Sequence, residues 1–248
     1  MASSTDKTLL GKVALITGGS RGIGRAIAAA YAKAGARVFI CGRDLAAVDD
    51  ARREIRAGGA EIEGVAGDIS RPDDVQRIVR AALERCGAID VLVNNAGILG
   101  PRDTIANYPL EAWEEVIRIN LTGQFLMTRE VLPIMLARRS GSIINVTSGV
   151  GRAGKANWGA YAVSKAGLEG FTQVLAEEVR LAGIRVNAVN PAATRTQMRA
   201  KAYPAEDPTT LPMPAEVVPI FVHLASDASK EITGQSLHAR DWVKKTFD

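Results

Sequence analysis

Short apolar runs rich in Val and Ile recur along this chain, and each is followed by a longer stretch with helical periodicity. The runs lack an alternation of apolar and polar residues, which is typical of parallel strands buried on both faces. Repeated strand–helix units with right-handed crossovers cover such a sheet with helices on both sides, so the predicted fold class is α/β with a doubly wound parallel sheet. The predicted strands are 12–17, 37–41, 62–67, 89–94, 142–147, 184–189 and 235–239, and the predicted helices are 22–34, 44–57, 73–86, 110–138, 159–182 and 214–226.

The length of 248 residues fits one doubly wound unit. No internal repeat, low-complexity stretch or linker divides the sequence, so we expect a single domain over 1–248. The least regular segment, 191–213, contains four prolines. It is predicted to be a mobile loop near the end of a strand.

The formal net charge is +4, from 31 Lys and Arg against 27 Asp and Glu. Basic clusters lie far apart, are interleaved with acids and lack clustered aromatic residues, so we interpret them as solvated faces and expect no nucleic-acid partner. Only the pI of about 9.2 favours nucleic acid. The clusters are Arg52, Arg53 and Arg56; Arg138 and Arg139; and Lys244 and Lys245.

Cys41 and Cys86 lie far apart in the sequence, with no CxxC and no neighbouring His. They predict neither a disulfide framework nor a metal site, but two buried thiols in a reducing compartment. Residues 1–10 contain no apolar core of signal-peptide length, and the sequence has no run of about 18 apolar residues. We therefore expect a cytoplasmic protein with no membrane partner.

A glycine-rich turn, TGGSRGIG at 17–24, separates the first predicted strand from the first predicted helix. Glycine allows positive φ and lets the backbone approach a pyrophosphate, which then lies against free N–H groups at the helix start. The GxxxGxG spacing alone is a weak signal, because an ordinary turn also accounts for it. Its position between strand and helix favours a dinucleotide site.

The residues at the end of the second predicted strand indicate which dinucleotide is bound. An NAD site would place an acid there to bind the ribose hydroxyls, but this chain has Arg43 followed by Asp44. An arginine fork suits a 2′-phosphate, and Arg21 within the turn is placed to join it. We therefore predict NADP(H) as cofactor. The alternative makes Arg43 a surface residue, and in either case Asp44 is expected to cap the following helix.

Tyr161 and Lys165 are spaced i,i+4 near the start of the predicted helix 159–182, so both project from one helix face. A phenol can act as an acid/base near neutrality only if a nearby cation favours the phenolate. We therefore expect Lys165 and a positively charged nicotinamide ring to lower the Tyr161 pKa. A YxxxK string alone is commonly a surface pair, but Ser148 at a strand end and Asn120 within a predicted helix support the functional interpretation.

In this combination and order, the motifs resemble those of the short-chain dehydrogenase/reductase (SDR) family, in particular its 3-oxoacyl reductase-like branch. The resemblance covers about residues 10–237 and implies a single Rossmann domain with a seven-stranded parallel sheet, in agreement with the number of predicted strands. The matching segments are 17–24 (TGGSRGIG), Asp68-Ile69, Asn94 to Gly97, Asn120, Ser148, Tyr161 with Lys165, 187–196 (NAVNPAATRT) and 232–235 (ITGQ).

The resemblance also assigns roles on the cofactor side. Asp68 and Ile69 would contact the adenine, Asn95 to Gly97 would line the adenosine side, and Pro191 to Thr196 would hold the nicotinamide carboxamide and a nearby phosphate. The complete set of implied cofactor-binding residues is Gly18, Ser20, Arg21, Gly22, Ile23, Gly24, Arg43, Asp68, Ile69, Asn95, Ala96, Gly97, Tyr161, Lys165, Pro191, Thr194 and Thr196.

On the catalytic side, the resemblance implies that Tyr161 gives its proton to a carbonyl oxygen as hydride arrives, or removes one from an alcohol in reverse. Ser148 would hydrogen-bond the same oxygen. Lys165 would bind the nicotinamide ribose, and Asn120 would hold a water that relays protons to Lys165. Simpler structural roles remain open for the outer members, since Asn120 could break its helix locally and Asn94 could close a turn.

Several departures from the family pattern lie on the substrate side. The family's Pro-Gly is Pro191-Ala192 here, and the usual C-terminal VDGG is replaced by residues 239–242, ARDW. The segment 197–213 is shorter than the substrate loop of many relatives, and the RxG that usually precedes a PEEV-like element, here 214–217, is missing. The pocket and a subunit contact are therefore in doubt.

We expect an NADP(H)-dependent oxidoreductase that interconverts a ketone and a secondary alcohol, with 191–213 as its substrate loop. A homotetramer would assemble through 110–138 and 159–182, as in the family. The alternatives are a 3-oxoacyl-[acyl-carrier-protein] reductase of fatty-acid synthesis and, from another class, a non-catalytic cofactor-binding scaffold or sensor. Candidate pocket residues, which fit a small or medium carbonyl compound without identifying it, are Leu99, Arg152, Asn157, Trp158, Ala193 and Met198.

The carrier-protein alternative makes a separate prediction. Docking of an anionic carrier in the related reductases uses basic residues beside the cleft. The matching positions are Arg139 and Ala182, with Arg180 the nearest substitute for a basic residue at 182. We therefore expect free small ketones to be reduced at least as well as carrier-linked acyl groups.

Overall fold

Seven parallel strands form one sheet in the order β3-β2-β1-β4-β5-β6-β7. The computed structural model describes residues 7–243, so the Lys244-Lys245 cluster lies outside the described residues. The predicted doubly wound parallel sheet is confirmed, with strand ends within about two residues of those expected. The strands are β1 Val13–Thr17, β2 Arg37–Gly42, β3 Ile62–Ala66, β4 Val91–Asn94, β5 Gly141–Val146, β6 Ile184–Asn190 and β7 Ser236–His238.

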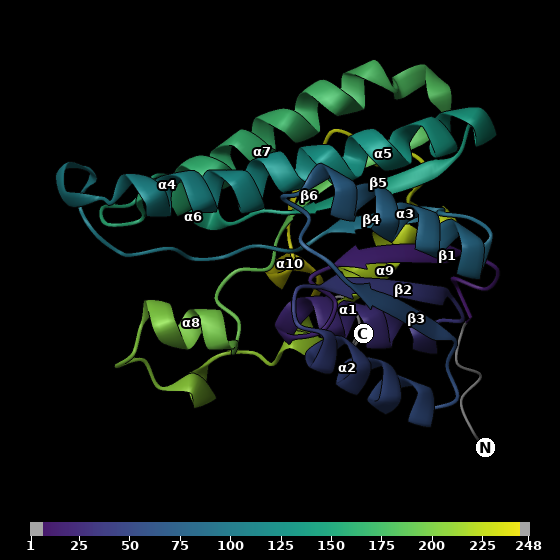
Figure 1. Cartoon of the computed structure of the whole chain (residues 1–248), viewed down its shortest axis with the longest axis horizontal. Helices are drawn as coiled ribbons and strands as arrows, with labels where there is room; N and C mark the ends of the chain where they lie inside the picture. The colour runs from purple at the N-terminus through teal and green to yellow at the C-terminus, as the bar shows by residue number, and fades with distance from the viewer. Residues whose placement is uncertain (1–6, 244–248) are drawn as a thin grey trace.

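The helices pack on both faces of the sheet (Figure 1). One face carries α1, α2 and α9, whose buried side chains include Ile27, Val48 and Phe221. The other face carries α3, α5 and α7, with Ile78 and Met127 among the buried residues. The helices are α1 Gly22–Lys33, α2 Leu45–Ala57, α3 Pro72–Cys86, α4 Leu110–Ile117, α5 Gly123–Arg138, α6 Gly149–Arg152, α7 Gly159–Glu178, α8 Gln197–Ala202, α9 Pro219–Ala225 and α10 Arg240–Val243.

The single helix predicted over 110–138 is interrupted. A π-helical turn, Arg118–Thr122, separates α4 from α5 and has the buried Asn120 at its centre. Similarly, the helix predicted over 159–182 ends at Glu178 and continues as a short 3₁₀ turn, and 214–226 divides into a 3₁₀ turn and α9. Local periodicity does not show such breaks, because tertiary contacts cause them.

The segment 191–213 differs from the predicted irregular loop. It contains α8 and a short 3₁₀ turn. The Arg199 guanidinium binds the Glu206 carboxylate through two hydrogen bonds of 2.6 Å each. Arg195 donates to the carbonyl oxygens of Thr209 and Leu211. These contacts join the two halves of the segment, so it is an ordered substructure and not an irregular loop.

The predicted burial of Cys41 and Cys86 is confirmed, and burial raises the pKa of the Cys41 thiol to about 12. Within residues 7–243, no helix is long and apolar enough to span a bilayer, and no group of three or more His, Cys, Asp or Glu residues is arranged to hold a metal ion.

Candidate active site

The order of the strands reverses between β1 and β4, and a ligand crevice is expected outside the carboxyl ends of the strands at such a point. The glycine-rich turn follows β1, and the segment Asn95 to Gly97 follows β4. The remaining predicted site segments also follow strand ends, at Ser148 after β5 and at Pro191 after β6. The topology therefore brings these parts of the sequence to one edge of the sheet.

The turn after β1 leaves no room for a side chain at Gly18 or Gly24. A Cβ atom added at Gly24 would lie 2.3 Å from the Gly18 carbonyl oxygen, and Gly18 and Gly22 have φ of +63° and +52°. Arg21 occupies the N-cap position of α1 but makes no capping hydrogen bond with its side chain, and the first helical turn contains no acid. The backbone N–H groups at the start of α1 therefore have no side-chain cap, and such groups bind anions such as phosphate.

The loop after β4 is fixed against this turn. The Thr17 hydroxyl accepts hydrogen bonds from the backbone N–H groups of Asn95 and Ala96, at 2.9 and 3.0 Å. The Asn95 amide donates to the Thr17 carbonyl oxygen at 2.9 Å. Asn94 does not close a turn: its buried amide donates to Thr128 on α5 and Asn145 on β5. The two loops form one rigid unit.

Arg21 and Arg43 both have acidic neighbours near the end of β2. Arg21 forms an ion pair with Asp44, and Arg43 lies 3.9 Å from the Glu115 carboxylate on α4. Asp44 accepts a hydrogen bond from the backbone N–H of Ala47, so its predicted role as the cap of α2 is confirmed. Both arginines are more than half exposed and are accessible to a bound group.

Asp68 and Ile69 lie at the end of β3 in different environments. The Asp68 carboxylate accepts from the backbone N–H and the hydroxyl of Ser70, at 2.9 and 2.7 Å. The Ile69 side chain is buried and packs against Gly123, where an added Cβ would lie 2.9 Å from it. A ligand could therefore contact Ile69 only through the backbone atoms of that residue.

Tyr161 and Ser148 line the same cleft, and Ser148 lies near enough to the phenol to lower its pKa. Tyr161 belongs to the first turn of α7, and Ser148 follows β5. The Lys165 ammonium lies one helical turn further on, 5.8 Å from the centre of the Tyr161 ring. It is buried and donates a 2.7 Å hydrogen bond to the Val146 carbonyl oxygen. The structure thus brings three of the four predicted catalytic side chains together.

In the protein chain by itself the Tyr161 pKa is raised, whereas the expected lowering was for Lys165 acting together with a bound nicotinamide. Burial raises the pKa of the phenol, and the nearby Ser148 only partly offsets this. Burial also lowers the pKa of Lys165 to about 8. The ammonium is directed at a backbone carbonyl, so desolvation is the largest influence on both groups.

Asn120 connects three elements below the cleft. Its amide oxygen accepts from the Ile98 N–H at 2.8 Å, and its amide nitrogen donates to the Ile98 carbonyl oxygen at 2.8 Å and to Ser164 at 3.2 Å. The π-helical turn directs this side chain inward. Asn120 thereby fixes the loop after β4 against α7.

The segment after β6 forms the far wall of the cleft. Ala192 has φ of +61°, a left-handed conformation that favours glycine. Its N–H donates to the Asn190 side chain at 2.9 Å. The Thr194 hydroxyl donates to the Pro191 carbonyl oxygen at 3.1 Å, and Thr196 caps α8. Alanine at 192 thus adopts a conformation that glycine, the residue expected from the family pattern, would adopt without strain.

The cleft has a volume of about 340 Å³. Of the predicted pocket residues, Leu99, Trp158, Ala193 and Met198 line it. Arg152 and Asn157 do not: Arg152 binds Glu169 and the Leu237 carbonyl oxygen, and Asn157 occupies a turn with φ of +65°. Lining residues that the sequence did not indicate include Thr147, Gly149, Val150 and Lys155, whereas Arg199, Ala202 and Tyr203 belong to the predicted substrate loop 191–213.

The unusual C-terminal sequence forms the short helix α10. The Ala239 N–H donates to the Asn190 carbonyl oxygen at 3.0 Å, and Arg240 reaches the Ala193 carbonyl oxygen at 3.5 Å. Trp242 stacks near His223, with ring centres 4.5 Å apart. Where relatives have a glycine turn, this chain therefore supports the cleft wall with a helix.

Comparison with known proteins agrees with this geometry. The short chain dehydrogenase family model matches residues 12–207. An uncharacterized oxidoreductase of Escherichia coli K12, YciK, is 36% identical over 232 residues, which are 92% of each chain. A 3-oxoacyl-[acyl-carrier-protein] reductase of Synechocystis sp. PCC 6803 is 40% identical over 238 residues, 93% of this chain and 96% of that protein. The chain belongs to the short chain dehydrogenase family of oxidoreductases.

A solved structure of a short chain dehydrogenase from Shigella flexneri 2a, complexed with NADP, superposes with a TM-score of 0.91 at 36% identity, covering 95% of this chain and 99% of that one. A second, from Escherichia coli CFT073 and complexed with NADPH, has a TM-score of 0.90 at 36% identity, with 94% and 99% covered.

Proposed function

We propose that the protein is an NADP(H)-dependent oxidoreductase that interconverts a ketone and a secondary alcohol, with Tyr161 as the acid/base. The observation that carries this proposal is that Tyr161 and Ser148 line one cleft, beside an uncapped helix start. A proton donor and a second hydroxyl in one cleft are what reduction of a carbonyl group requires.

The residues present fit the dinucleotide. At Gly18 and Gly24 an added Cβ would collide with the turn or with the loop after β4, so glycine keeps this turn tight, and the uncapped start of α1 offers its N–H groups to a pyrophosphate. Arg43 and Arg21 are accessible at the end of β2. A 2′-phosphate bound there would replace their carboxylate neighbours as ion-pair partner. The relatives crystallised with NADP and NADPH support this choice of cofactor.

When bound, the nicotinamide supplies the hydride. Tyr161 donates its proton to the carbonyl oxygen, and Ser148 donates a hydrogen bond to the same atom and so stabilises the charge that develops there. Because burial raises the Tyr161 pKa, the phenol is protonated before reduction. Lys165 would bind the cofactor ribose, and Asn120, which holds the loop after β4, would position a proton-relaying water.

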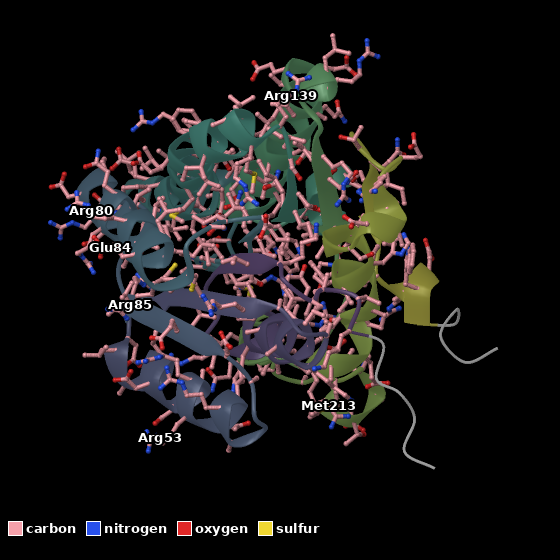
Figure 2. The ribbon with its side chains drawn as sticks, turned by 90° about the vertical axis from the view of Figure 1, so that its right-hand side faces the viewer. Arg53, Arg80, Glu84, Arg85, Arg139 and Met213 are labelled. Carbon is pink, nitrogen blue, oxygen red and sulfur yellow. The ribbon has the colours of Figure 1, made fainter. Side chains whose placement is uncertain are left out.

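The second candidate is reduction of a 3-oxoacyl group on a carrier protein, because relatives at 36–40% identity carry that name. The expected docking residue does not lie beside the cleft. Arg139 ends α5, just before β5 begins, and therefore lies at the edge of the sheet opposite Ser148. Figure 2 labels it at the tip of the molecule. Its guanidinium donates to the Leu181 carbonyl oxygen, and Arg180 has Glu177 as a neighbour.

The test compares kcat/KM for an acetoacetyl carrier-protein substrate with that for small free ketones, at low and moderate salt, with NADPH and NADH. We expect the free ketones to react at least as well. A carrier-linked value more than ~100-fold higher, about 2.7 kcal/mol of additional transition-state binding, would replace the proposal with the second candidate. A scaffold or sensor would bind NADPH but would not oxidise it in the presence of any of the ketones.

We further propose a cytoplasmic homotetramer assembled through α5 and α7. Both helices carry apolar side chains that are 43–59% exposed, namely Phe125, Val163 and Val174, and Figure 1 shows the two helices on the outer side of the molecule. Val174→Asp should therefore lower the mass measured by light scattering. Leu45→Asp, a comparably exposed site on α2, serves as control, and an unchanged mass for Val174→Asp would contradict this interface.

A further inference from the structure

Two aromatic rings lead along the cleft away from Tyr161. The Trp158 ring centre lies 5.5 Å from that of Tyr161 and 6.1 Å from that of Tyr203. Beyond them, the Lys155 ammonium donates a 3.3 Å hydrogen bond to the Tyr203 hydroxyl. Lys155, Trp158 and Tyr203 all line the cleft. The outer end of the cleft therefore has a defined chemistry, separate from the reacting end.

Three cations surround the Tyr203 ring. The guanidinium carbons of Arg199 and Arg102 lie 3.9 and 4.7 Å from its centre, and the Lys155 ammonium lies 5.7 Å away. Arg102 also stacks on Trp158 at 4.9 Å. Such stacking holds a guanidinium in place while its charge stays available.

The charge of this cluster is only partly neutralised. Glu206 binds Arg199, but among residues 7–243 neither Lys155 nor Arg102 has a carboxylate oxygen within 4 Å. Two cations and no Asp or Glu are found among the residues that line the cleft. Burial alone would raise the Tyr203 pKa, yet the surrounding cations lower it overall, consistent with a positive potential at this place.

We propose that the cluster of Lys155, Arg102, Arg199 and Tyr203 binds an anionic group of the substrate, a carboxylate or a phosphate remote from the reacting carbonyl carbon. The apolar side chains of Leu99, Val150 and Met198 between the two ends would cover the connecting carbon chain. This inference rests on the proposed ketone reduction and names its substrate class. In Figure 1, α8, which supplies Arg199, lies on the same side of the molecule as α4 and α6.

The test uses two pairs of substrates that differ in charge. One pair is 5-oxohexanoate and its methyl ester, and the other is acetoacetyl-4′-phosphopantetheine and acetoacetyl-pantetheine, which lacks the phosphate. The kcat/KM of the purified full-length enzyme with NADPH is measured for each. We expect the anionic member of at least one pair to exceed its neutral partner tenfold or more, and the pair that does so identifies carboxylate or phosphate.

Variants locate the effect. Lys155→Gln should reduce the anionic preference at least fivefold through KM while the neutral partner changes less than twofold, and Lys155→Glu should reverse the preference. Lys201→Gln, an exposed lysine of α8 that does not line the cleft, is the matched control and should change neither. Activity with the neutral substrate shows that each variant is folded.

Ratios near one in both pairs would overturn this inference while leaving ketone reduction intact. An equal loss for both members of a pair in Lys155→Gln, or the same loss in Lys201→Gln, would also overturn it. If no ketone of either charge is reduced, the proposed function itself fails, and the substrate class falls with it.

Discussion

The Lys165 ammonium and the Val146 carbonyl oxygen are 2.7 Å apart, and this hydrogen bond fastens α7 to the end of β5 beneath Ser148. The bond satisfies a buried cation without a carboxylate. Burial nevertheless lowers the Lys165 pKa to about 8, from the 10.5 of the free side chain. The folded chain thus keeps a costly charge where a cofactor ribose would be held.

This charge predicts a pH dependence of stability. Below about pH 8, Lys165 is protonated in both the folded and the unfolded protein, and its burial destabilises the fold. As the pH rises from about 8 to 10.5 the folded protein loses this proton first, so the destabilisation decreases, by about 3 kcal/mol at most. The free energy of unfolding of wild type minus that of Lys165→Met should therefore increase over this range in urea titrations. A constant or decreasing difference would contradict the assignment.

Arg43→Ala should raise the KM for NADPH tenfold or more while changing that for NADH less than twofold. Only the 2′-phosphate loses a charge-assisted partner, worth roughly 1.5–3 kcal/mol. Arg53→Ala, on the outer surface of α2 (Figure 2), is the control. If the wild type already uses NADH better than NADPH, or if both cofactors suffer equally, the role given to Arg43 is wrong.

Ala192→Gly should stabilise the protein by about 1 kcal/mol. A left-handed alanine costs roughly 1–2 kcal/mol, which exceeds the extra freedom that glycine gains on unfolding, roughly 0.4–1 kcal/mol. Ala193→Gly, next in the chain and not in the left-handed region, should destabilise instead. Urea unfolding of the two variants gives opposite signs on this account, and a loss of stability in both would contradict it.

The sheet could be predicted from the sequence because strands buried on both faces contain continuous apolar runs, and β1 is buried at every position. The glycine turn could also be predicted. Only glycine fits at Gly18 and Gly24, so the glycine spacing in the sequence indicates the turn. Both features can be read from the residue types of one short segment, without knowledge of contacts between distant segments.

The outer cleft depends on such contacts and was not predictable. Tyr203 and Lys155 come from irregular segments with no periodicity, and only the folded chain places them together. Arg152 was expected in the pocket, but the buried Glu169 on α7 draws it away. The raised Tyr161 pKa of the chain by itself could not be predicted from the i,i+4 spacing either, because that spacing does not show how deeply the phenol is buried.

Substitution of Tyr161 by phenylalanine tests the central claim most directly, because it removes only the transferable proton. Tyr108→Phe is the matched control: Tyr108 packs in the same apolar cluster, and its buried hydroxyl has no hydrogen-bond partner within the described chain. The measurement is kcat for ketone reduction alongside the Kd for NADPH. We predict that Tyr161→Phe binds NADPH as the wild type does and loses at least about 10²-fold in kcat, with Tyr108→Phe near wild type. Retention of more than about a tenth of wild-type kcat by Tyr161→Phe would contradict the account.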